Sequence, residues 1–177
     1  KESFSTNRVH LGMDEAVMLG LGNYLKENGY KKGSLIIREH CNRVVDICRK
    51  LELKPMIWSD MYITANSTGG YYDLPENTDC SKWEKPKKDL GLVYWDYYHD
   101  DTRTYEKMLD IHAQLSDNVI FAGGSWIWNG ISPNYSKTYA CTKAALSTCK
   151  KYNIKEVLCT AWMDNGTTIP LPTASLT

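Results

Sequence analysis

The sequence predicts an α/β fold built on a parallel sheet, and two observations support this prediction. Short apolar segments of strand length alternate with longer segments whose apolar residues recur at helical spacing. No two-residue hairpin turn joins any two of the expected strands. Apolar strands that alternate with helices are typical of parallel sheets, because the helices cover both faces of the sheet.

Each expected element follows from its own local pattern. Strands are expected where a short apolar run is bounded by polar residues. Ser34 is expected to cap the helix that it begins. The polar stretch 64–89 is rich in Gly, Asn, Pro and Lys, and we expect a loop with at most a short helix. The expected strands are 9–13, 55–62, 90–96, 118–126 and 156–162, and the expected helices are 16–28, 34–52, 101–116 and 135–152.

The composition excludes several classes of function. The chain has 177 residues, 42% of them hydrophobic and 24% charged, as in an ordinary globular domain with a sizeable core. Lys plus Arg (21) equals Asp plus Glu (21) and no basic cluster occurs, so nucleic acid is not an expected partner. The apolar runs are too short to cross a bilayer, and no signal peptide is visible in a chain that begins at Lys1.

The six cysteines predict buried free thiols. They form no Cys-x-x-Cys pair, and no histidine stands at ligand spacing, so we expect no metal and no other cofactor. Free thiols favour a reducing, cytoplasmic location. Two pairs, Cys41 with Cys48 and Cys141 with Cys149, have the spacing of a core-facing side of a helix.

Two adjacent carboxylates, Asp14 and Glu15, follow the first expected strand and form the clearest chemical signal. Because strand side chains alternate, His10, Gly12 and Asp14 share one face, and Glu15 lies just past the strand end. One acid can then face an enclosed site while the other meets a substrate from the side. The alternative is that both acids only favour the first turn of the next helix through its dipole.

Aromatic and acidic residues recur at the ends of the later strands. Active sites assemble at the carboxyl ends of parallel strands. Flat aromatic walls with carboxylates suit a sugar ring, whose C–H faces and hydroxyls need both. The alternative for each aromatic residue is a plain core position. The recurring pairs are Trp58-x-Asp60, Tyr94-x-Asp96, Trp126-x-Trp128 and Trp162-x-Asp164.

Taken in order, five motifs resemble the strand ends of glycoside hydrolase family 20, the β-N-acetylhexosaminidases. The resemblance is greatest to the bacterial and hexosaminidase D branch, which carries His-x-Gly-Met-Asp-Glu. It implies a TIM (β/α)8 barrel, of which residues 1–177 form a partial catalytic domain covering roughly strands 4 to 8. The motifs are His10-Leu-Gly-Met-Asp-Glu-Ala, Trp58-Ser-Asp-Met-Tyr, Val93-Tyr-Trp-Asp-Tyr-Tyr, Gly123-Gly-Ser-Trp-Ile-Trp and Thr160-Ala-Trp-Met-Asp-Asn-Gly.

The resemblance implies a retaining reaction without a protein nucleophile, on terminal non-reducing β-linked N-acetylglucosamine or N-acetylgalactosamine. In this family the substrate acetamido oxygen attacks the anomeric carbon. By similarity, Glu15 is the general acid and base, Asp14 orients the acetamide, and Tyr94 binds the acetamido oxygen. The remaining residues implied to surround the substrate are His10, Trp58, Asp60, Asp96, Trp126, Trp128, Trp162 and Asp164.

The sequence also departs from the family pattern. Met163 stands where relatives carry Gly, and residues 167–169 offer no acid, so the preference between gluco and galacto sugars stays open. The family's first three strands have no counterpart, so we expect an incomplete barrel that is inactive or nearly so when isolated. We expect its edges to be covered by a second copy, by other segments of the same polypeptide or by aggregation. A non-catalytic carbohydrate-binding relative and an inactive fragment are the alternative functions.

Overall fold

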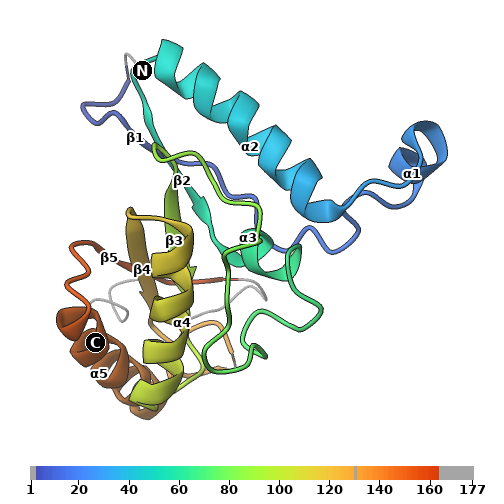
Figure 1. The fold of residues 1–177 in the computed structure, drawn as a ribbon. Coiled ribbons are helices and arrows are strands. Elements are labelled where there is room, and N and C mark those ends of the chain that lie inside the picture. Colours follow the sequence, from blue (N-terminus) through green and yellow to red (C-terminus); the bar gives the residue numbers. More distant parts are fainter. Residues whose placement is uncertain (1–2, 130, 164–177) are drawn as a thin grey trace. The chain divides into compact units, whose positions relative to one another are not determined.

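The structure is a computed structural model that describes residues 3–129 and 131–163 and shows a mixed α/β fold (Figure 1). Its five strands form one sheet in chain order, β1-β2-β3-β4-β5. This parallel, helix-alternating arrangement is compatible with part of a TIM barrel. The elements are β1 (Arg8–His10), α1 (Asn23–Asn28), α2 (Gly33–Lys50), β2 (Lys54–Trp58), α3 (Asp60–Thr64), β3 (Gly91–Trp95), α4 (Thr102–Leu115), β4 (Val119–Gly124), α5 (Tyr135–Lys151) and β5 (Val157–Thr160).

The chain divides into two compact units. The first unit contains the residues up to Val93 together with Ile111–Val119, and the second contains Tyr94–Asp110 together with the residues from Ile120 onward. The division passes through β3 and through α4. Each unit is described separately below.

In the first unit, β2 is the central strand, paired in parallel with β1 and with β3. Val9 lies opposite Pro55, and Ile57 lies opposite Leu92. Helix α2 contacts β2 and α3 and buries one side, because its apolar residues recur every three or four positions. The buried residues of that side are Ser34, Ile37, Cys41, Val45 and Cys48.

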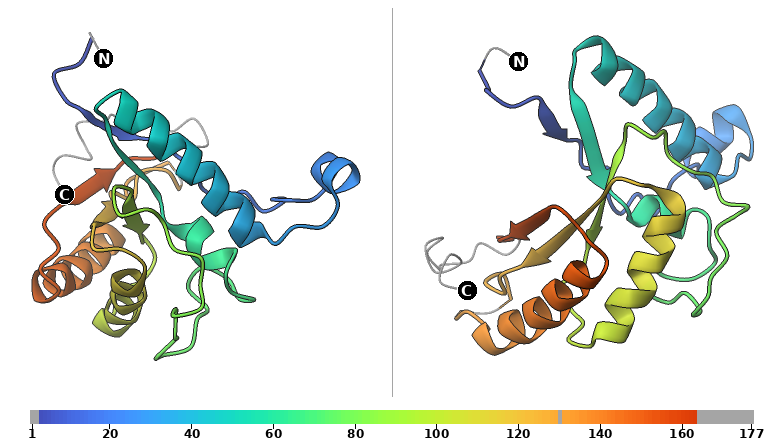
Figure 2. Two further views of the ribbon diagram at one scale, coloured as in Figure 1. Left: turned by 45° about the horizontal axis from the view of Figure 1, so that its top comes forward. Right: turned by 60° about the vertical axis from the view of Figure 1, so that its left-hand side comes forward.

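In the second unit, β4 and β5 pair in parallel, with Phe121 opposite Val157 and Gly124 opposite Thr160. Helix α5 runs alongside these strands in both views of Figure 2. A side chain at Gly124 would lie within 3 Å of Tyr97, Trp128 and Thr160, since a Cβ there falls 2.8, 2.9 and 2.9 Å from their atoms. Only glycine fits this close approach.

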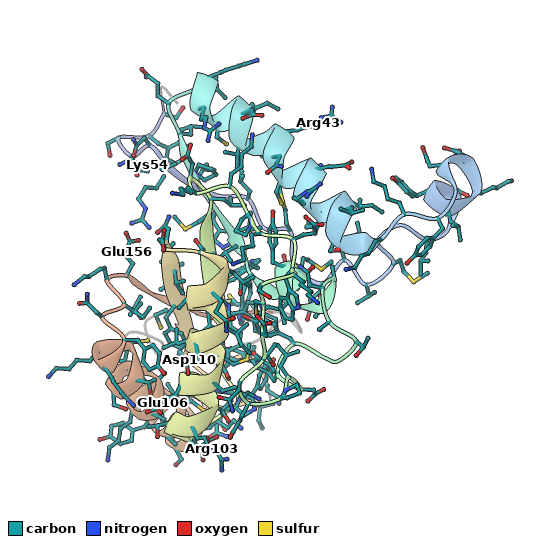
Figure 3. All side chains as sticks on the ribbon, viewed as in Figure 1. Arg43, Lys54, Arg103, Glu106, Asp110 and Glu156 are labelled. Carbon is teal, nitrogen blue, oxygen red and sulfur yellow. The ribbon has the colours of Figure 1, made fainter. Side chains whose placement is uncertain are left out.

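Charged side chains on α4 link it to the following helix. Glu106 of α4 accepts a hydrogen bond from Lys151 of α5 at 2.9 Å (Figure 3). Asp110, one turn further along α4, is hydrogen-bonded to Tyr152, and burial together with this carboxylate raises the pKa of Tyr152 to about 12. Partly exposed pairs such as Glu106–Lys151 contribute little to stability.

The helix predicted over 16–28 is largely wrong. Only Asn23–Asn28 is helical, and none of its residues is buried. Gly20 and Gly22 have positive φ angles of 78° and 58°, which a right-handed helix does not allow. Of the expected apolar residues, Leu21 is 44% exposed and Leu19 is only half-buried, so the segment does not bury one continuous helical side. Helix α1 stands away from the rest of its unit (Figure 1).

The strand predicted over 55–62 ends early. It runs from Lys54 to Trp58, and Ser59 already has right-handed helical angles (φ −85°, ψ −14°). Ser59 leaves the strand while its N–H still donates to Val93 O at 3.0 Å. A short helix, α3, then buries Asp60, Met61, Tyr62 and Ile63. The sequence pattern missed this turn because the residues that follow the strand are also apolar.

The remaining elements agree with the sequence prediction within a few residues. The three long helices α2, α4 and α5 begin and end close to the predicted positions, and 66–90 is a loop without a helix. Strand β1 is shorter than predicted. Five of the six cysteines are buried and free, as predicted, whereas Cys159 is free but exposed. Burial raises the pKa of Cys149 to about 11, so this thiol stays protonated at neutral pH.

No helix in the described part of the chain combines the length and the apolar character that crossing a membrane requires.

A buried polar network in the first unit fixes the turn that follows β2. Ser59 Oγ lies 2.7 Å from the hydroxyl of Tyr71 and 2.7 Å from Nε2 of His112, which is hydrogen-bond distance to both. All three side chains are buried. The network therefore ties the end of β2 to the loop that contains Tyr71 and to the carboxyl-terminal part of α4.

This network predicts a contrast between two buried serines. Ser59→Ala removes the partner of two buried polar groups and is expected to lower the free energy of unfolding by about 1–3 kcal/mol. Ser34 is equally buried, yet among the described residues its hydroxyl has no hydrogen-bond partner. Ser34→Ala should therefore change stability little or raise it. Urea unfolding of the two variants measures the contrast, and equal losses would contradict the assigned network.

Candidate active site

The two acids of the first motif lie on an irregular turn after β1. Asp14 and Glu15 are both exposed, and the preceding backbone is left-handed at Gly12 and Met13, each with φ of 70°. Glu15 itself has φ of 49°, an unusual angle for a residue with a side chain. The nearest helix, α1, begins only at Asn23, so the alternative reading of these acids as the first turn of a helix is wrong.

His10 and Trp58 form one side of this turn. Their ring centroids are 4.3 Å apart and their planes are tilted by 54°. The N–H of Gly12 donates to His10 Nδ1 at 3.1 Å, which places the ring proton of the neutral form on Nε2. Burial lowers the pKa of His10, and the negative charge of Asp14 opposes this shift. His10 is therefore a neutral ring that supports the turn, and its expected contact with a substrate stays a prediction.

The side chain of Asp60 contacts the backbone of Glu15. This residue begins α3 and is 3% exposed, and its Oδ2 accepts the N–H of Glu15 at 2.8 Å. The N–H of Ala16 points to the sulfur of Met61 at 3.2 Å. The structure thus brings the carboxylate of Asp60 to the main-chain amide of Glu15, a contact that the strand-end pattern did not predict.

In the second unit, Tyr94 and Asp96 lie together and are enclosed by protein. Tyr94 has no exposed surface, donates its hydroxyl proton to Asp96 Oδ2 at 3.0 Å, and packs against Tyr105 and Phe121 with ring centroids 6.2 and 5.5 Å away. Both side chains are buried, so neither is open to solvent in this structure. Their contacts with a substrate stay predictions.

Asp96 also organises the segment that follows β3. One of its oxygens accepts the N–H groups of Tyr98 and His99, and the other lies 2.8 Å from His99 Nδ1. The hydrogen bond to Asp96 raises the pKa of His99, while partial burial acts in the opposite direction. Asp96 therefore holds the backbone after β3 much as Asp60 holds the backbone of Glu15 in the other unit.

The tryptophans of the second unit form an aromatic cluster, defined here as Trp95, Tyr97, Trp126, Trp128 and Trp162. Trp126 and Trp128 stack with centroids 4.8 Å apart, and Trp95 stacks on Tyr97 at 5.7 Å. Trp126 Nε1 donates to the carbonyl oxygen of Tyr97 at 2.5 Å. Lys137 Nζ lies 5.1 Å from the ring centre of Trp126. The structure therefore brings together Trp126, Trp128 and Trp162, as the strand-end pattern predicted.

Sequence reasoning missed two members of this cluster. Trp95 and Tyr97 alternate with Tyr94 and Asp96, so they lie on the opposite face of β3 and its extension. The alternation of side chains along a strand showed that these residues share a face, but it did not show that this face carries the aromatic cluster. Asp164, the last acid of the recurring pattern, lies outside the described residues.

Comparison with known proteins adds no relative: no protein-family model matches the chain, and no curated protein matches it.

Each unit thus contributes one chemical feature. The first displays two carboxylates on a turn whose backbone is held by Asp60, and exposed acids can donate a proton or stabilise a positive charge. The second contains the aromatic cluster, in which Trp126 and Trp128 are each only 9% exposed.

Proposed function

We propose that this protein is a glycoside hydrolase that removes terminal non-reducing β-linked N-acetylhexosamine by a retaining, substrate-assisted mechanism. The observation that carries the proposal is the Asp14–Glu15 pair, exposed on a turn that a buried carboxylate holds by its backbone. A protein that only binds sugar has no need of a general acid. The five ordered motifs and the parallel α/β sheet support the same proposal.

In this proposal the two acids have different roles. Glu15 protonates the leaving-group oxygen and then removes a proton from the attacking water. Asp14 accepts a hydrogen bond from the acetamido N–H and stabilises the positive charge that develops as the oxazolinium ring forms. The acetamido oxygen of the substrate acts as nucleophile, so the chain needs no nucleophilic side chain.

The aromatic cluster supports sugar recognition. Trp126 and Trp128, each 9% exposed, are held in place by stacking on one another, and Trp126 also by its hydrogen bond to Tyr97 O. Fixed rings lose little side-chain entropy when a ligand binds. We assign them to the sugar ring and its N-acetyl group.

A second candidate is a carbohydrate-binding relative without catalysis. The enclosure of Tyr94, whose hydroxyl is already bonded to Asp96, favours this alternative, because the substrate-assisted mechanism needs a donor to the acetamido oxygen. Both functions predict sugar binding, but only the first predicts bond cleavage.

A pair of aryl glycosides separates these functions. We expect the parent enzyme, with its barrel closed, to hydrolyse 4-nitrophenyl N-acetyl-β-glucosaminide or its galacto isomer, and not 4-nitrophenyl β-glucoside, which lacks the acetamido nucleophile. Release of 4-nitrophenolate measures both reactions. Equal rates on substrates with and without the N-acetyl group would exclude acetamido participation, and tryptophan quenching by N-acetylglucosamine without any cleavage would favour the binding relative.

A further inference from the structure

Two side chains at the start of α3 accept the backbone N–H groups of Glu15 and Ala16, which lie on the turn that carries Asp14 and Glu15 (the acid-bearing turn). Asp60 Oδ2 accepts the N–H of Glu15 at 2.8 Å, and the sulfur of Met61 lies 3.2 Å from the N–H of Ala16. The residues in contact are 45 positions apart in sequence. The backbone of Glu15 is therefore positioned by a separate element of the first unit and not only by its own neighbours.

The contact with Asp60 is the stronger of these two. A hydrogen bond from an amide to a carboxylate is charge-assisted and shorter than a bond to a neutral acceptor, whereas a thioether sulfur is a weak acceptor. Asp60 is also buried, and a buried carboxylate is destabilising unless donors surround it. The amide of Glu15 is one such donor, so breaking the contact is unfavourable for both partners.

Hydrogen bonds of the preceding residue, Ser59, fix the position of Asp60. Ser59 is held by Tyr71 and His112 through its hydroxyl and by Val93 O through its N–H. The carboxylate of Asp60 therefore projects from a turn that has little freedom to move. A fixed acceptor can hold Glu15 at its unfavourable φ of 49°, because the hydrogen bond compensates part of the cost of that angle.

We propose that Asp60 is a positioning residue that acts on the reaction through the backbone of Glu15, and not a ligand of the sugar. This inference rests on the proposed function, in which Glu15 is the residue that transfers the proton. Asp60 is 3% exposed and has one oxygen bonded to a main-chain amide, an arrangement suited to holding a loop rather than to meeting a sugar hydroxyl.

The first test compares leaving groups. Asp60→Ala is expected to lower kcat on a poor leaving group, such as N,N′-diacetylchitobiose, on the order of 10²-fold, because small displacements of a catalytic group have effects of this size. The loss on an activated aryl glycoside should be much smaller, since that substrate needs little protonation. KM should change little on either substrate. Asp60→Asn keeps an oxygen that can accept the Glu15 N–H, so it should recover a large part of the lost kcat.

The control is a variant of another aspartate whose carboxylate also accepts a backbone N–H group. Asp101 precedes α4 and accepts the N–H of Thr104 at 2.8 Å. Asp101→Ala should lower the melting temperature without any dependence on the leaving group. A rise in KM by the same factor on both substrates for Asp60→Ala would instead identify Asp60 as a sugar ligand, and equal losses of kcat on both would identify a purely structural role.

A second measurement does not depend on activity. Amide hydrogen exchange of the protein should show faster exchange at Glu15 in Asp60→Ala than in wild type or in Asp101→Ala. Unchanged exchange at Glu15 would overturn the proposal, even in an active enzyme. If wild type cleaved neither substrate, the proposed function would fail, and this exchange experiment would still decide whether Asp60 holds the turn.

Discussion

Replacing Glu15 by glutamine is expected to lower kcat on a natural disaccharide by ~10²–10⁴-fold, the usual contribution of general acid–base catalysis. Glutamine has almost the same shape but cannot donate a proton to the glycosidic oxygen. Glu15 is exposed on its turn, so the substitution should leave the folded state intact. Steady-state rates on chitobiose and on an activated aryl glycoside measure the effect, and the activated substrate should recover part of the rate.

A matched control is available on the same unit. Glu27 lies exposed on α1, and Glu27→Gln makes the same chemical change away from the paired acids. Its rate should equal that of wild type on both substrates. An unchanged rate of Glu15→Gln on the disaccharide would remove Glu15 from the role of general acid.

Replacing Asp14 by asparagine is expected to lower kcat by about 10²–10³-fold, the size seen when one group that stabilises transition-state charge is removed. The carboxylate acts on charge that develops only as the oxazolinium forms, so KM should change less than kcat. A thiazoline inhibitor that resembles the oxazoline should therefore bind much more weakly to the variant. Calorimetric titration of this inhibitor gives the comparison directly.

Asp117→Asn provides the control for this second substitution, because Asp117 is an exposed aspartate of the same unit outside the acid-bearing turn. It should bind the thiazoline as wild type does. If Asp14→Asn also bound the inhibitor with wild-type affinity, Asp14 would not be the residue that stabilises the acetamido group.

The sequence predicted best the elements whose patterns are long and periodic. Helices α2, α4 and α5 each repeat their apolar positions over three or more turns, and their ends fall close to the predicted residues. The segment 16–28 also has apolar residues at helical spacing, but the left-handed angles of Gly20 and Gly22 override it. Spacing alone does not report whether another element is present to cover the apolar side.

The candidate site could be predicted in part. Adjacent acids after an apolar strand are a local signal, so the sequence alone predicts Asp14 and Glu15 as candidates. The contact from Asp60 to Glu15 joins residues 45 positions apart, and no local pattern encodes it. The enclosure of Tyr94 depends on which face of β3 meets Tyr105 and Phe121, and alternation along a strand leaves that choice open.

If Glu15 is the general acid, its left-handed backbone makes thermal stability and catalytic activity depend in opposite ways on this one residue. An angle of this kind in a residue with a side chain costs about 1–3 kcal/mol, and glycine would relieve most of it. A directed-evolution experiment that selects only for heat resistance should therefore favour Glu15→Gly. The same replacement deletes the proposed proton donor, so in the proposed mechanism the most heat-resistant clones would be the least active, and selection for both properties would have to gain its stability elsewhere in the chain.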